Sequence, residues 1–172
     1  MNTRFFLTAD GSHTLFNETL NAYYHSIHGA LRESQHVFIN LGLREALNCY
    51  LSEDSNGNSE TKPVVTIFEM GFGTGLNAVL TWREAEKMQG RFISTSIRFD
   101  AIYYDAFAPA AQPELWTQEI FEKLTPWLKT GGNLTTYCSK GYVKRNLKAA
   151  GFTVQKHPGP GYKREVLRAI RN

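Results

Sequence analysis

The chain has 172 residues and a mass of 19.5 kDa, a length that predicts one domain over residues 1–172 rather than two. Hydrophobic residues make up 42% and charged residues 20%, and no apolar run approaches the roughly 18 residues that span a bilayer. This excludes a membrane-embedded protein, and because the N-terminus lacks the apolar region of a signal peptide we expect a cytoplasmic protein without a membrane partner.

The net charge of +3 is distributed unevenly along the chain. Residues 140–172 carry nine basic residues and one acidic residue, a net charge of +8, whereas residues 1–139 carry −5. A basic block on an acidic body is typical of proteins that bind a polyanion. The alternative is that these side chains only solvate the face of a helix, and charge alone favours neither interpretation.

The N-terminal part of the chain combines a hairpin with helical segments. Two short apolar runs around Asp10 and Gly11 predict a hairpin over residues 4–16. Apolar residues at helical spacing then predict helical segments over residues 29–51, with a break at Gly42.

A polar loop over residues 52–62 ends this extension (residues 1–62) and leads to the core of the domain (residues 63–172). The core is expected to alternate strands, over residues 64–69, 99–104, 133–138, 152–156 and 164–170, with helices over 76–88, from Pro113 to Gly131-Gly132, and over 141–150. Alternation predicts a mostly parallel sheet covered on both faces, and the short last connection predicts an antiparallel last strand.

The stretch FEMGFGTGLN, residues 68–77, places three glycines between a strand and a helix, where parallel sheets bind ligands. The spacing matches neither a dinucleotide fingerprint nor a P-loop, because the third glycine comes one residue early and no Lys-Ser/Thr pair ends the turn. Glu69 ends the strand, and a carboxylate there repels phosphate and suits a cation. S-adenosylmethionine has a sulfonium, an ammonium and no phosphate, so its charges match a turn with a carboxylate at the end of the strand. The alternative is a tight strand–helix turn that binds no ligand.

A second polar position follows the next strand, in the stretch DAFAP, residues 105–109. Asp105 is expected at the carboxyl end of a parallel strand beside the glycine turn, with Phe107 and Pro109 as an apolar wall. A side chain at this position can face the methyl group that S-adenosylmethionine transfers. The alternative is a turn in which Asp105 only caps local backbone amides.

The chain resembles the methyltransferase domain of the MnmC family (MnmD where it stands alone). The resemblance is carried by FEMGFGTGLN, DAFAPAAQPELWTQEIF, GGNLTTYCSKGYVKRNLKAAGF and PGYKREVLRA, and it continues N-terminally through TADGSHTL, YYHSIHGALRESQHVF and NLGL. It implies an α/β fold of the Rossmann-like class I methyltransferases, with S-adenosyl-L-methionine as the cofactor.

The resemblance also implies a substrate. In the family, the 5-aminomethyl group on the wobble 2-thiouridine of certain tRNAs becomes 5-methylaminomethyl. In bifunctional relatives a flavin-dependent oxidoreductase domain supplies that amine, and we expect no such domain here because the chain stops at Asn172. We therefore expect methyl transfer only, with tRNA as the partner and a separate oxidoreductase or other enzyme as the source of the amine.

By position, the resemblance assigns residues to the site. Cofactor binding is expected from Glu69, Gly71, Phe72, Gly73, Thr74, Gly75 and Asn77, and catalysis from Asp105. Pocket closure and tRNA contacts are expected from Tyr24, Ser26, Glu33, Ser34, Phe107, Lys140, Lys144, Arg145, Lys163 and Arg164. Trp116 either flanks the base or packs in the core.

The stretch between Gly75 and Asp105 is short for this class of fold. Only RFISTSIR precedes the strand FDAIYY, so the usual second and third strands of the sheet lack room. No acid lies between Lys87 and Asp100 to bind the ribose of the cofactor. Either the numbering omits a segment, or the sequence carries a deletion, or the protein is a naturally shortened form.

Two other functions stay open, a small-molecule methyltransferase on the same fold and a non-catalytic RNA-binding module. No metal is expected, because His25, His28 and His36 lack a partnering pattern such as H-E-x-x-H. Cys49 and Cys138 belong to no C-x-x-C pair, so neither a zinc knuckle nor a disulfide framework is expected.

Overall fold

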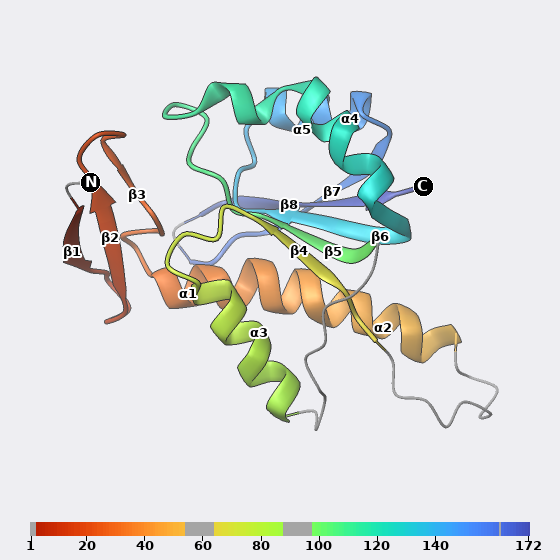
Figure 1. The fold of residues 1–172 in the computed structure, drawn as a ribbon, viewed down its shortest axis with the longest axis horizontal. Helices are drawn as coiled ribbons and strands as arrows, with labels where there is room; N and C mark the ends of the chain where they lie inside the picture. The colour runs from red at the N-terminus through yellow and green to blue at the C-terminus, as the bar shows by residue number, and fades with distance from the viewer. Residues whose placement is uncertain (1–2, 54–63, 88–97, 162) are drawn as a thin grey trace.

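The chain forms a small N-terminal sheet and a larger central sheet that is flanked by helices (Figure 1). The structure, a computed structural model, describes residues 3–53, 64–87, 98–161 and 163–172. The predicted polar loop and the end of the predicted helix over residues 76–88 fall largely outside these residues. The architecture is the Rossmann-like α/β fold that the sequence predicts.

The N-terminal sheet consists of three antiparallel strands, β1 (Thr3–Leu7), β2 (His13–Asn17) and β3 (Ala22–Tyr23). The pairing of β1 with β2 confirms the predicted hairpin. Asp10 holds the turn, because its Oδ1 accepts hydrogen bonds from the Thr8 hydroxyl at 2.7 Å and the Ser12 backbone N–H at 3.1 Å. Its Oδ2 accepts from the Arg32 backbone N–H at 2.9 Å, which attaches the hairpin to the first helix.

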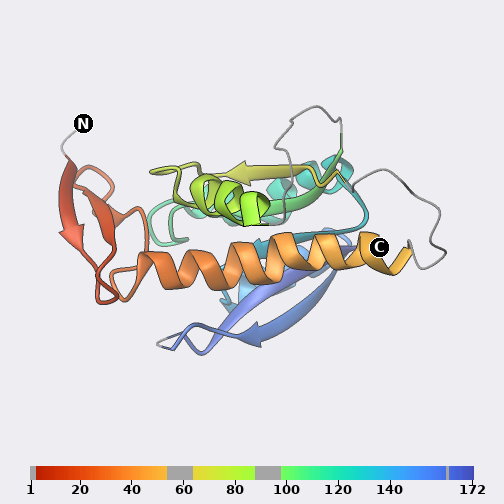
Figure 2. The ribbon, with the colours of Figure 1, turned by 90° about the horizontal axis from the view of Figure 1, so that it is seen from below.

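A long helix follows and runs along one face of the central sheet (Figure 2). It is built from α1 (Ala30–Ser34), the π-helical segment η1 (Gln35–Leu43) and α2 (Arg44–Glu53). The predicted break at Gly42 is wrong, because the helix continues through this residue. A Cβ at Gly42 would lie 2.9 Å from Cε1 of Tyr103, so the glycine allows the helix to pack closely on the sheet.

The central sheet has the strand order β4-β5-β6-β8-β7. Its strands are β4 (Ile67–Met70), β5 (Phe99–Tyr104), β6 (Leu128–Thr136), β7 (Phe152–Pro158) and β8 (Glu165–Arg171). β4, β5 and β6 are parallel, and β8 is antiparallel to both of its neighbours, which confirms the predicted antiparallel last strand. The carboxyl ends of β4 and β5 therefore lie side by side.

The prediction that a helix ends at Gly131-Gly132 is wrong, since both glycines lie inside β6. Gly131 has a φ of +77°, and the pairing of β5 with β6 shifts register between Phe99 and Ala101. Two steps along β5, from Phe99 to Ala101, correspond to five steps along β6, from Leu128 to Asn133, and a glycine lets the strand accommodate this irregularity without ending. The preceding helical stretch instead ends at a 3₁₀ turn, η3 (Thr125–Trp127).

Helices cover both faces of the central sheet (Figures 1 and 2). One face carries the 3₁₀ turn η2 (Pro113–Trp116), α4 (Gln118–Leu124) and α5 (Gly141–Ala149), and the other carries the long helix and α3 (Leu76–Lys87). Each face has its own apolar core, one around Ile102 and Leu134 and one around Phe38 and Tyr103. Burial of both faces explains why β5 is apolar over nearly its whole length.

Within the described part of the chain, β4 pairs with β5 alone and so forms one edge of the central sheet. Residues 88–97, the stretch in which the sequence leaves no room for the usual second and third strands, lie outside the described residues.

Candidate active site

The glycine turn connects β4 to α3 and lies against the end of β5. Gly71, Gly73 and Gly75 have φ values of +87°, +55° and +78°, which other residues rarely adopt. A Cβ at Gly71 would lie only 2.3 Å from the backbone oxygen of Asp105. Glycine is therefore required at position 71 for its conformation and for the close approach of the turn to Asp105.

Asn77, near the start of α3, joins the two carboxylates that the sequence assigns to the cofactor and to catalysis. Its Nδ2 donates hydrogen bonds to Oε1 of Glu69 at 2.8 Å and to Oδ2 of Asp105 at 2.9 Å. Its Oδ1 is buried and has no hydrogen-bond partner within the described residues. That orphaned acceptor is available to an N–H group of a ligand.

Asp105 lies where the glycine turn meets a pocket, and its side chain is only 10% exposed to solvent. Burial raises the pKa of Asp105 from 3.8 to about 7, although the hydrogen bond from Asn77 opposes this rise. Burial also raises the pKa of Glu69, against the same opposing hydrogen bond. A carboxyl group that titrates near neutral pH is suited to accept a proton during a reaction.

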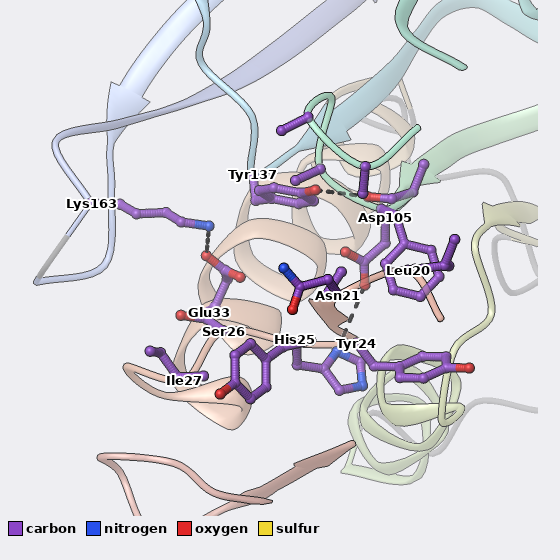
Figure 3. Close-up of a pocket in the computed structure, with 17 residues that line it drawn as sticks. Leu20, Asn21, Tyr24, His25, Ser26, Ile27, Glu33, Asp105, Tyr137 and Lys163 are labelled. Atoms are coloured by element: carbon purple, nitrogen blue, oxygen red, sulfur yellow. Dashed lines mark hydrogen bonds and ion pairs between the residues drawn. The ribbon is translucent and has the colours of Figure 1, made fainter. Parts of the chain in front are cut away.

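A pocket of about 470 Å³ opens beside Asp105 (Figure 3). Of the residues predicted to contact substrate, those that line it are Tyr24, Ser26, Glu33, Phe107 and Lys163. The rings of Tyr24 and Phe107 meet edge to face with their centroids 5.1 Å apart, so this wall is aromatic. Ser34, which was also predicted here, is 2% exposed and does not line the pocket.

His25 is a pocket residue that the sequence did not assign to the site. Its Nε2 shares a hydrogen bond of 2.7 Å with the hydroxyl of Thr74 in the glycine turn, and its Nδ1 lies 4.0 Å from Oδ2 of Asp105. Burial lowers the pKa of His25. In the sequence, His25 is considered only for a metal, although it stands next to Tyr24 in the stretch YYHSIHG.

The three histidines that the sequence considered for a metal have unrelated surroundings. His36 Nε2 hydrogen-bonds the backbone oxygen of Pro158 at 2.7 Å, whereas His28 is exposed. Across the described ranges, no group of three His, Cys, Asp or Glu side chains is placed to hold a metal ion.

Glu33 and Lys163 form an ion pair in the pocket wall (Figure 3). Nζ of Lys163 also lies 4.3 Å from the centroid of the Tyr137 ring, and the Tyr137 hydroxyl donates to the backbone oxygen of Ala106 at 2.7 Å. The sequence predicted a phosphate contact for Lys163, but the structure directs its ammonium to Glu33. Tyr137 was missed, because an aromatic residue after a buried strand has no distinctive pattern.

The other predicted tRNA-binding cations do not line the pocket. Lys140 and Arg145 are exposed and Lys144 is half-buried around the start of α5, and Arg164 is exposed just before β8. Trp116 is fully buried, and its Nε1 donates to the backbone oxygen of Phe107 at 2.9 Å. Trp116 therefore packs in the core and does not flank a base.

The residues at the glycine turn fit the charged end of S-adenosylmethionine. Glu69 and Asp105 place two carboxylates beside a turn without lysine or arginine, and Asn77 offers its buried acceptor. Phe72 is 62% exposed, and its ring lies 3.1 Å from where a Cβ at Gly75 would stand. In this class of fold an acidic residue at the end of the second strand binds the ribose of the cofactor. The described residues contain no strand beyond β4 that could carry such a residue.

None of the helices in the described ranges is both long enough and apolar enough to cross a membrane.

Comparisons with known proteins identify the family and the fold of the chain. A family model described as S-adenosyl-L-methionine-dependent methyltransferase matches residues 80–172, more than half of the chain. The crystal structure of MNMC2 from Aquifex aeolicus is similar, with a TM-score of 0.80 and 22% sequence identity over 98% of this chain and 70% of that chain. A methyltransferase from Pyrococcus furiosus gives a TM-score of 0.44 and 14% identity over 74% of this chain and 83% of its own. The chain therefore belongs to this family of S-adenosyl-L-methionine-dependent methyltransferases, and it has the fold of the MnmC methyltransferase domain that its sequence resembles.

Proposed function

We propose that the protein methylates the 5-aminomethyl group on the wobble 2-thiouridine of tRNA in the cytoplasm, giving 5-methylaminomethyl-2-thiouridine. The observation that carries this proposal is the position of Asp105. Its carboxylate lines the pocket, and Asn77 hydrogen-bonds both to this carboxylate and to Glu69, which precedes the glycine turn. The resemblance to the MnmC family supplies the identity of the substrate.

The chemistry follows from these groups. S-adenosylmethionine, when bound, supplies a methyl group on a sulfonium, which is already activated for displacement. The pocket attracts an alkylammonium through the carboxylates of Asp105 and Glu33. Above about pH 7 the ionised Asp105 accepts one proton from that ammonium, and the neutral amine is then the nucleophile. The enzyme otherwise contributes by holding the reactants in line.

The surroundings of the pocket suit a nucleotide within RNA. Tyr24 and Phe107 offer aromatic surface to a base that has been turned out of its stack. Exposed cations at Lys140, Arg145 and Arg164 offer contacts to a phosphate backbone. We propose that a separate flavin-dependent oxidoreductase, or another enzyme that makes the same amine, supplies the substrate.

The decisive experiment is transfer of labelled methyl from S-adenosylmethionine to tRNA from cells that lack the modification, followed by nucleoside analysis. We expect label only in 5-methylaminomethyl-2-thiouridine. Three controls accompany it: the variant Asp105→Asn, a transcript without the 5-aminomethyl group, and the free nucleoside. Labelling of the free nucleoside but not of tRNA would favour a small-molecule methyltransferase, and salt-dependent tRNA binding without cofactor binding would favour a binding module.

A further inference from the structure

The pocket contains a second charged group besides Asp105. Glu33 comes from α1 and Lys163 from the connection between β7 and β8, and the two form an ion pair across the pocket wall. Their side chains are 8% and 26% exposed, so water screens the pair only weakly. Figure 3 shows Lys163 and Glu33 on one side of the pocket, with Asp105 on the other.

Tyr137 connects this ion pair to the stretch that carries Asp105. Its ring lies beneath the ammonium of Lys163, with 4.3 Å between Nζ and the ring centroid. Its hydroxyl donates to the backbone oxygen of Ala106, the residue after Asp105, at 2.7 Å. The position of Lys163 is therefore coupled by direct contacts to the backbone next to Asp105.

We propose that Glu33 and Lys163 are positioning residues whose opposite charges set the proton occupancy of Asp105, and thereby the pH range in which the pocket accepts a cationic amine. The consequence of this ion pair for methyl transfer rests on the proposed function, whereas the effect of the pair on the protonation of Asp105 does not. Lys163 acts here through the pocket and not through a phosphate of tRNA.

The polar and titratable groups around Asp105 come from several separate elements. They are Glu69 and Asn77 at the glycine turn, His25 after β3, Glu33 on α1, Tyr137 after β6 and Lys163 before β8. Burial raises the pKa of Asp105, and the like charges of Glu33 and Glu69 raise it further. The hydrogen bond from Asn77 and the positive charge of Lys163 lower it. Glu33 and Lys163 thus act on Asp105 in opposite directions.

This opposition gives a test that a purely structural role cannot imitate. The carboxyl carbon of Asp105 is followed by ¹³C NMR in the full-length protein as pH is raised, with Asp105→Asn used to assign the signal. Wild-type Asp105 is expected to titrate at about pH 7. Glu33→Gln is expected to lower the midpoint by about 1 pH unit, and Lys163→Met to raise it by a similar amount. Lys163→Arg keeps the cation and should leave the midpoint in place.

Thermal melting of each variant controls for folding, and if Lys163→Met does not fold, Glu33→Gln and Lys163→Gln carry the test. Midpoints that do not move, or that move in the same direction in both variants, would overturn the proposal. So would a Lys163→Met variant that binds tRNA more weakly while Asp105 titrates as in the wild type, because Lys163 would then act on phosphate. Since the titration needs no methyl acceptor, its result is separate from whether wild-type protein methylates tRNA.

Discussion

The side-chain amide of Asn77 donates a hydrogen bond to the carboxylate of Asp105 over 2.9 Å. The same nitrogen donates to Glu69 at 2.8 Å, so one buried amide holds two carboxylates from neighbouring parallel strands. Burial disfavours the charged form of both carboxylates, and the hydrogen bonds from Asn77 offset part of this cost. Asn77 therefore couples the cofactor side of the site to the pocket side.

Replacement of this amide should change the pH dependence of the enzyme. In Asn77→Ala the hydrogen bond that lowers the pKa of Asp105 is lost, so the pH midpoint of kcat should rise above that of the wild type. Unfolding free energy should fall by about 1–3 kcal/mol, because two partly buried carboxylates lose a hydrogen-bond donor.

Asn146→Ala is the matched control for this change. Its Nδ2 donates to the backbone oxygen of Trp116 at 2.8 Å, away from the pocket. Asn146→Ala should lower the unfolding free energy without moving the pH midpoint of kcat. If both variants leave that midpoint unchanged, Asn77 does not act on Asp105.

The glycine turn should tolerate no side chain at Gly71. Gly71→Ala combines a positive φ with a Cβ 2.3 Å from the Asp105 backbone oxygen, and should lower the unfolding free energy by more than about 3 kcal/mol. Gly131→Ala has a similar φ, +77°, but nothing lies within 4 Å of its Cβ, so its cost should be about 1 kcal/mol. Urea unfolding of the two variants measures the difference, and equal costs would contradict the close approach of the turn to Asp105.

Asp105 should make the protein less stable as pH rises. Its pKa is about 7 in the folded protein and 3.8 ordinarily, so between these pH values the folded state binds the proton and the unfolded state does not. Unfolding free energy therefore falls with rising pH through this window and levels off above pH 7.

Asp105→Asn removes this penalty and should be more stable than the wild type at pH 8, by roughly 2–4 kcal/mol, with little difference at pH 4. The same variant should lose methyl transfer, because the proton acceptor is gone. Urea unfolding at pH 4 and pH 8, beside activity, tests both statements. A variant with no added stability at pH 8 would mean that Asp105 is not held against a desolvation cost.

Trp116 should matter for stability and not for recognition of a base. Trp116→Ala removes a fully buried ring that packs against Tyr104 and should cost about 3–5 kcal/mol of unfolding free energy. Trp82→Ala, at a position 51% exposed on α3, should change the unfolding free energy by less than about 0.5 kcal/mol. A Trp116 variant that melts like the wild type but binds tRNA poorly would reverse this assignment.

The sequence by itself determined the features that depend on neighbouring residues. Turn residues around Asp10 predicted the hairpin, and alternating strand and helix patterns predicted the parallel sheet with its antiparallel last strand. Glycine spacing and Glu69 pointed to a cationic ligand, since the geometry of a turn and the charge at a strand end are local properties. The two errors at Gly42 and Gly131 arose because a glycine that serves close packing or a bulge looks in sequence like one that ends a helix.

Tertiary structure decided which side chains surround Asp105. His25, Glu33, Tyr137 and Lys163 reach one pocket from separate elements, and the Glu33–Lys163 pair spans 130 positions of sequence. The degree of burial, which raises the pKa of Asp105, comes from the packing of these elements, and no pattern of nearby residues encodes it. Local patterns therefore indicated that a site exists at the ends of β4 and β5, whereas the packing of distant segments set its charge balance.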